Sequence, residues 1–242
     1  MIWPHLTSAP EKYNLCVVSP DYRLAPQTRF PGILADIAAA MAYVRSPAFL
    51  ALTNGAVDQS KIIVSGGSAG GWLALLAGTG VGFAACGVEP PAKPLAIAAI
   101  YPISDLEDPF WTTKQHPVSY LPRVIEKQEM QAYLDAKAPP TSASSPDSTR
   151  SGFYGYMVSL PVTLDQSRAQ FLRCDRSRSE WLPKRRMCGS RDRELTSPHR
   201  NRGILASLLL DGTGISPKAF SIAPALASGE FTAPPTFIVH GT

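Results

Sequence analysis

The sequence predicts an α/β fold in which helices cover a mainly parallel sheet. Short apolar segments of strand length alternate along the chain with helix-forming segments, which is the order found in parallel sheets. A sharp glycine-rich turn joins one of these strands directly to the helix that follows it. The chain has 242 residues, of which 45% are hydrophobic, and this is enough for one domain with a full core.

The predicted elements follow in chain order. Residues 15–19 form a short apolar run that predicts a buried strand, and the segment PDYRLAP then leads through Phe30-Pro31 into a helix. The later strands are equally short and apolar, and the last of them lies near the carboxyl end of the chain. The predicted strands cover residues 15–19, 62–65, 96–100 and 236–240, and the predicted helices cover residues 32–45 and 70–78.

The segment IIVSGGSAGG, residues 62–71, has the pattern of a nucleophile elbow. In this motif the serine stands on a strained turn between strand and helix, so that Ser68 Oγ is exposed and Gly66 and Gly70 are required to be small. The backbone N–H of Ala69, at the start of the helix, is predicted to donate to an oxyanion. The alternative is a simple turn between strand and helix that has no role in chemistry. We favour the elbow, because the predicted strand and the predicted helix both lie where the motif requires them.

The stretch VVSPDYRLAPQTRFPGILADIAAAMAYV, followed by VSGGSAGG, is similar to the hormone-sensitive-lipase-like branch of the α/β-hydrolases, also called α/β-hydrolase fold-3. The resemblance covers residues 3–109 and again residues 208–242. It implies a carboxylic-ester hydrolase that uses Ser68 as nucleophile, needs no cofactor and takes a small-molecule ester. It also implies a helical cap between the last two strands.

The predicted organisation follows from this resemblance. Residues 1–104 are expected to form the hydrolase core with the elbow, residues 105–234 the cap, and residues 235–242 the final core strand. In the family an HGGG loop precedes the strand that matches residues 15–19, and the acid and the histidine follow the strand that matches residues 235–241. Since the sequence starts at Met1 and stops at Thr242, we expect it to be truncated at both ends and its sheet to be incomplete.

The triad acid and the base are therefore not identified. Asp105, which follows a predicted strand, is a weak candidate for the acid, because some α/β-hydrolases carry it there. The histidines are expected to be structural or exposed rather than catalytic: they are His5, His116, His199 and His240. Without a base Ser68 is a weak nucleophile, so the chain as written is expected to be almost inactive.

Residues 159–203 differ in composition from the rest of the chain. They hold ten arginines and one lysine against five acidic residues, whereas the whole chain carries a net charge of +4. The segment shows almost no apolar periodicity, and an apolar pattern resumes at Ile204, which suggests an atypical insertion such as a retained intron. The alternative is a genuine arginine-rich arm that binds RNA or phosphate groups, but no nucleic-acid-binding module accompanies it.

Other features set limits on location and cofactors. The four cysteines show no paired spacing, and Cys16 falls in a predicted apolar strand, so reduced, buried thiols in a cytoplasmic protein are expected, with no metal site. No stretch is long and apolar enough to cross a membrane. The sequence leaves the oligomeric state unknown.

Two other functions remain open. A prolyl-oligopeptidase-like serine peptidase also uses a G-x-S-x-G-G elbow, although the segment DYRLAP favours the esterase branch. A non-catalytic, hydrolase-like binding protein would explain the missing triad members by its function, although the retained Ser68 favours truncation.

Overall fold

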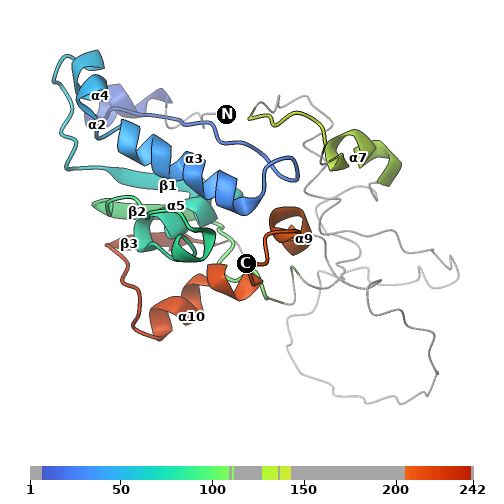
Figure 1. Cartoon of the computed structure of the whole chain (residues 1–242). Helices are drawn as coiled ribbons and strands as arrows, with labels where there is room; N and C mark the ends of the chain where they lie inside the picture. The colour runs from blue at the N-terminus through green and yellow to red at the C-terminus, as the bar shows by residue number, and fades with distance from the viewer. Residues whose placement is uncertain (1–6, 109–110, 112–126, 136, 143–204, 241–242) are drawn as a thin grey trace, which may run out of the picture.

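The structure is a computed structural model of the chain, and it describes residues 7–108, 111, 127–135, 137–142 and 205–240. Three strands and nine helical segments are placed in this part of the chain (Figure 1). The strands are β1 (Ile63–Gly67), β2 (Ala96–Ile100) and β3 (Thr236–Val239). The α-helices are α2 (Ala9–Tyr13), α3 (Phe30–Tyr43), α4 (Pro47–Leu52), α5 (Ala69–Thr79), α7 (Lys127–Leu134), α9 (Leu205–Leu210) and α10 (Ile222–Ala227), with 3-10 helices η1 (Ala84–Cys86) and η4 (Pro217–Phe220).

The three strands form one parallel sheet in the order β1-β2-β3. Gly67, the last residue of β1, is the register partner of Ile100, which in turn is the partner of Val239 in β3. The carboxyl ends of all three strands therefore lie together at one edge of the sheet. The parallel sheet with covering helices confirms the predicted fold class, and within the described residues the sheet is open at both sides.

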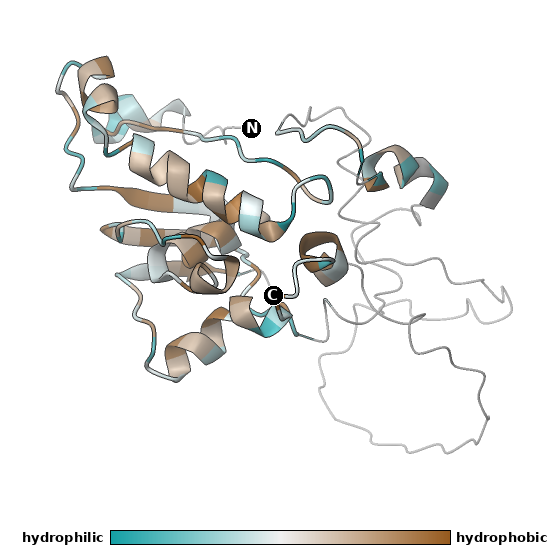
Figure 2. Cartoon of the chain, viewed as in Figure 1, coloured by the Kyte–Doolittle hydropathy of each residue, from teal (hydrophilic) through white to brown (hydrophobic). Residues whose placement is uncertain are grey.

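Helix α5 forms the centre of the core. It packs against β1 and β2 and contacts α3, and every residue from Gly71 to Thr79 is buried. A helix that is apolar on all sides needs neighbours on all sides, because each exposed apolar side chain would lose the free energy of burial. Figure 2 shows apolar colours on α5, on the sheet and on α9, whose leucines join the same core.

Three aromatic rings join α3, α5 and η4. The rings of Phe30 and Trp72 stack with their centroids 4.7 Å apart, and Phe220 meets the ring of Phe30 edge-on at 4.6 Å. All three side chains are almost fully buried. The indole Nε1 of Trp72 also donates a hydrogen bond of 3.3 Å to the carbonyl oxygen of Phe220. A segment far along the chain is thus fixed to the helix that follows the elbow.

The predicted elements agree with the structure except for the first strand. Residues 15–19 pair with no strand in the described part of the chain, and Leu15 and Val18 are 48% and 45% exposed. An extended segment becomes a strand only when a neighbour accepts and donates its backbone hydrogen bonds, and residues 15–19 have no such neighbour, although the outer edge of β1 is open within the described residues. The predicted helix at residues 32–45 begins earlier, at Phe30, because Pro31 fits the first turn of a helix.

The predicted cap and insertion lie mostly outside the described residues, so the division of the chain into core, cap and final strand stays a prediction. The described end of that region, from Leu205 to Ala227, packs on α3 and α5 through Leu209, Phe220 and Ile222. The resumption of the apolar pattern near Ile204 corresponds to helix α9.

The aromatic cluster gives a test of this packing. Phe220→Ala removes a fully buried ring between α3 and α5, and we expect it to lower the free energy of unfolding by about 3–5 kcal/mol. Urea denaturation followed by tryptophan fluorescence, with Trp72 as a reporter in the cluster, measures this change. The matched control is Phe237→Ala on β3, where the ring is 65% exposed and the expected loss is small. Equal losses for the two variants would contradict the described core.

Candidate active site

Ser68 stands at the junction between β1 and α5. Strand β1 ends at Gly67, α5 begins at Ala69, and Ser68 between them has φ 54° and ψ −119°, a conformation that residues with a side chain rarely adopt. The backbone of the serine is held on both sides: its amide donates to the carbonyl of Ile100 at 2.9 Å, and its carbonyl accepts from the amide of Trp72 at 3.0 Å. These features are those of the predicted elbow turn.

Two glycines make the turn possible, and one of them differs from the predicted pair. A Cβ on Gly66 would lie 2.9 Å from the Cα of Gly70 and closer still to the carbonyl group of that residue. A Cβ on Gly71 would lie 2.9 Å from the carbonyl oxygen of Gly66. A Cβ on Gly70 would meet nothing within 4 Å, so the predicted need for a small residue at Gly70 is wrong. The strand approaches the helix at the backbone of Gly70 and at the Cα of Gly71.

The predicted oxyanion donor is the amide of Ala69. Ala69 is the first residue of α5, and the first amides of a helix have no carbonyl partner within the helix. Within the described part of the chain, no hydrogen bond from the Ala69 amide is present. This amide is therefore free to donate to a ligand, and its role as an oxyanion donor stays a prediction.

Asp105 lies in the loop after β2, where its carboxylate is engaged in structural hydrogen bonds. It accepts a short hydrogen bond from the hydroxyl of Ser221, which is 1% exposed, and another of 2.9 Å from the amide of Glu107. The neighbouring carbonyl of Ser104 accepts from the amide of Ile222 at 2.8 Å. Asp105 thus fixes the start of α10 to the sheet, and nothing in the described residues pairs it with a histidine.

One histidine belongs to the described part of the chain. His240 directly follows β3 and is exposed. His5, His116 and His199 lie outside the described residues, and so do Cys174 and Cys188. The triad acid and base therefore remain unidentified.

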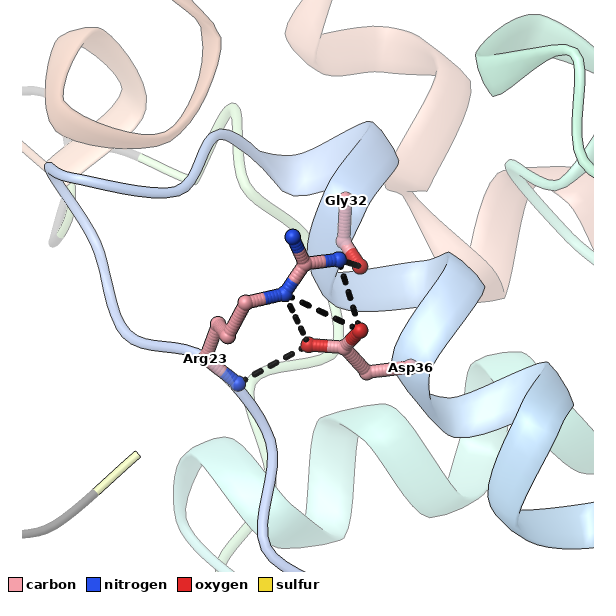
Figure 3. Close-up of polar contacts among 3 residues, drawn as sticks. All are labelled: Arg23, Gly32 and Asp36. Carbon is pink, nitrogen blue, oxygen red and sulfur yellow. Dashed lines mark hydrogen bonds and ion pairs between the residues drawn. The ribbon is translucent and has the colours of Figure 1, made fainter. Parts of the chain in front are cut away.

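The segment PDYRLAP is held on α3 by an ion pair that the sequence reasoning missed. The guanidinium of Arg23 contacts both oxygens of the Asp36 carboxylate, with Nη2 2.7 Å from Oδ1 and Nε 2.9 Å from Oδ2 (Figure 3). The backbone amide of Arg23 also donates to Asp36 at 2.9 Å, and Nη2 donates to the carbonyl of Gly32 at 3.3 Å. The hydrogen bonds from Arg23 lower the pKa of Asp36 below its usual value.

The following residues of the same segment hold two more elements. The side-chain amide of Gln27 donates to the carbonyls of Tyr133 and Asp135, at the end of α7, at 2.9 and 2.8 Å. The guanidinium of Arg29 donates to the carbonyls of Ser207 and Leu208 in α9, at 3.2 and 2.6 Å. The partners lie more than 100 residues away in the sequence, so no local pattern could have identified these contacts.

An open hollow on the surface lies away from the elbow. It measures about 490 Å³ and is lined by Asp21, Arg23, Asp36, Ala39, Ala40, Tyr43 and Ser142. These residues belong to α3 and to the loop that the ion pair holds, except for Ser142, which follows α7. The turn at Ser68, and not this hollow, is the candidate active site, because the turn holds a serine in a strained conformation between strand and helix.

The thiols and carboxylates of the described residues form no metal site: no group of three or more possible ligands is present among them. Cys16, which was predicted to be buried in a strand, is exposed, because residues 15–19 have no sheet partner. Cys86 is half-buried, and burial raises the pKa of its thiol to about 11. Within the same residues no helix has the length and hydropathy needed to span a membrane.

Comparison with known proteins identifies the family. A family model described as alpha/beta hydrolase fold, that of fold-3, matches residues 3–164. The chain belongs to the α/β-hydrolase fold-3 family. This match covers the elbow, the PDYRLAP segment and the ion pair with α3, and it confirms the resemblance stated from the sequence.

Two curated relatives are similar over parts of the chain. Non-reducing polyketide synthase ausA of Aspergillus calidoustus is 33% identical over 148 residues, which are 58% of this chain and 6% of the synthase. Neutral cholesterol ester hydrolase 1 of Pongo abelii is 39% identical over 72 residues, which are 30% of this chain and 17% of that protein. The chain thus spans less than a fifth of the length of either relative.

Two solved structures are also similar. One is a serine-to-alanine mutant of LAE6, an alpha/beta hydrolase enzyme from the metagenome of Lake Arreo, Spain, with 22% identity and a TM-score of 0.29, covering 60% of this chain and 35% of that one. The other is an arylesterase with 23% identity and a TM-score of 0.27, covering 57% of this chain and 39% of that one.

The close approach at the elbow gives a matched pair of variants. Gly66→Ala places a methyl group against the backbone of Gly70, and we expect it to cost about 2–4 kcal/mol of stability through strain at the turn. Gly70→Ala meets open space inside a helix and is expected to be neutral or to stabilise by up to about 1 kcal/mol. Thermal melts followed by circular dichroism measure both. A stable Gly66→Ala variant would show that the strand and helix do not approach as described.

The ion pair predicts a pH-dependent contribution to stability. The pKa of Asp36 is lowered in the folded chain, so its pairing stabilises the fold above the ordinary carboxyl pKa of about 4 and is lost as the pH falls through the lower folded value. Asp36→Asn should lower the urea midpoint near neutral pH by a small amount, and this difference should shrink in acid. Asp21→Asn, an exposed change in the same loop, is the control. A difference that is independent of pH would exclude this linkage.

Proposed function

We propose that this protein hydrolyses carboxylic esters of small molecules through an acyl-enzyme on Ser68. The observation that carries the proposal is the strained serine, with φ 54° and ψ −119°, at a sharp junction between a parallel strand and a buried helix. Strain of this kind persists where the surrounding structure enforces it and is concentrated at functional sites. Family membership adds support, and so does the local similarity to a protein named as a cholesterol ester hydrolase.

The chemistry assigned to the chain's own groups is acyl transfer. Ser68 Oγ attacks the ester carbonyl, a base takes the hydroxyl proton, and the carbonyl oxygen becomes an oxyanion that accepts a hydrogen bond from the Ala69 amide. When the tetrahedral intermediate collapses, the bond to the alcohol breaks, and the alcohol leaves with the proton. Water then releases the acid from Ser68. No cofactor takes part in these steps.

The base and the acid that orients it are not among the assigned residues. Asp105 is engaged with Ser221 and Glu107, and His240 is exposed beyond β3. A hydrolase whose serine has no base retains only the catalysis that comes from binding and from oxyanion stabilisation. We therefore expect the chain on its own to acylate slowly and to deacylate more slowly still, so that it is almost inactive in turnover.

The proposed setting is a cytoplasmic one with a small-molecule substrate. Cys16 and Cys86 are both free thiols, which is usual in a reducing compartment. Partners such as nucleic acid are not part of the proposal, since the basic residues 159–203 carry no recognisable binding module.

Site-specific acylation tests the proposal without the need for turnover. The full chain is incubated with excess p-nitrophenyl acetate, and the product is analysed by intact mass and peptide mapping. We expect one acetyl group per chain, located on Ser68, and none there in Ser68→Ala. Ser65→Ala changes an exposed serine three residues earlier on β1 and is the matched control. It should be acetylated at Ser68 at the parent rate.

Two outcomes would favour the other functions. Acylation by dipeptidyl p-nitroanilides in preference to esters would indicate a serine peptidase. Saturable binding of an ester that leaves Ser68 unmodified would indicate a hydrolase-like binding protein and would overturn the proposed acyl-enzyme.

A further inference from the structure

Tyr101 occupies the position next to Ser68 on the neighbouring strand. Gly67 and Ile100 are register partners at the ends of β1 and β2, and Ser68 and Tyr101 are the residues that follow them. The amide of Ser68 donates to the carbonyl of Ile100, which belongs to the same peptide group as the amide nitrogen of Tyr101. That nitrogen donates in turn to the carbonyl of Val239 in β3. One peptide group therefore fixes both residues at the carboxyl edge of the sheet.

Tyr101 shares the backbone strain of the nucleophile. Its φ is 38°, and among the described residues only three other non-glycine positions have positive φ: Asn14, Asn54 and Ser68. Asparagine enters this region with little difficulty, whereas a bulky aromatic residue does so only where its surroundings require it. The two positive-φ positions that are not asparagine are Ser68 and Tyr101, and they follow register partners on adjacent strands.

Packing does not account for the strain at Tyr101. Its side chain is 41% exposed, whereas Pro102 and Ile103, the next two residues, are buried. Tyr101 is not among the residues that form the core or pack against it. Tyr101 thus combines backbone strain with an exposed ring at the carboxyl edge of the sheet, which is where parallel sheets bind ligands. This combination favours a role in ligand binding over a role in packing.

We propose that Tyr101 is a specificity-determining residue whose ring forms one wall of the site for the acyl group and limits the acyl chain length. The inference rests on the proposed acyl-enzyme at Ser68. The acyl group is the part of the ester that becomes attached to Ser68, so it is the part within reach of a residue one strand away. A bulky ring at this position excludes long chains by occupying the space beside the nucleophile.

The test compares acyl transfer to Ser68 from p-nitrophenyl acetate, butyrate and octanoate in the full chain. Tyr101→Gly removes the ring and suits the positive φ, so it should retain the melting temperature of the parent while the ratio of octanoyl to acetyl transfer rises about tenfold. Tyr101→Phe keeps the ring and should keep the parent ratio. Asn54→Gly relieves a positive φ of 50° in an exposed turn and is the matched control, with no change in the ratio.

The outcomes separate this inference from the proposed function. An unchanged ratio in Tyr101→Gly, or equal slowing of all three esters together with a lower melting temperature, would overturn the role of Tyr101 while Ser68 remains the acylated residue. Absence of acylation at Ser68 in the parent chain would overturn the proposed function and this inference with it. A raised ratio in Asn54→Gly would also overturn it, because the effect would then arise from the backbone at a distance.

Discussion

The close contact between the backbones of β1 and α5 is the constraint on which the rest of the structure depends. Because Gly66 has no side chain, the strand can pass against the helix at Gly70 and Gly71, and the turn between them becomes sharp enough to place Ser68 at positive φ. The hydrogen bond from Ser68 to Ile100 then attaches this turn to β2. Ser68, the proposed nucleophile, is thus positioned by hydrogen bonds and contacts of the backbone.

Polar contacts from one short stretch of chain, residues 23–29, join three helices to it. Arg23 forms an ion pair with Asp36 of α3, Gln27 donates to a carbonyl at the end of α7, and Arg29 donates to a carbonyl of α9. Gln27 and Arg29 donate to backbone carbonyls at or near the ends of α7 and α9, where helix carbonyls commonly accept from side chains. The aromatic contact between Phe30 and Trp72 then joins this stretch to the helix of the elbow.

The elements that could be predicted from the sequence are those whose local apolar pattern also finds a partner in the folded chain. The apolar runs at β1, β2 and β3 and the helix after Ser68 are recognisable because each is short, uniform and bounded by glycine or proline. Residues 15–19 have the same local pattern but no ladder partner among the described residues, and hydrogen-bond pairing is a property of neighbours that a local pattern does not contain. The same reason explains why Gly71, whose constraint comes from Gly66 and Ile100, was missed, and why the hydrogen bond from Ser221 to Asp105 could not be predicted.

The contacts of residues 24–29 also bear on how the chain accommodates changes of length. The amide of Leu24 donates to the carbonyl of Thr141, and Arg29 holds Ser207 and Leu208, so the two sides of residues 143–204 are attached to one short stretch of the core. The core therefore holds the described ends at Thr141 and Ser207 through its own groups, so their positions do not depend on the length of the chain that joins them.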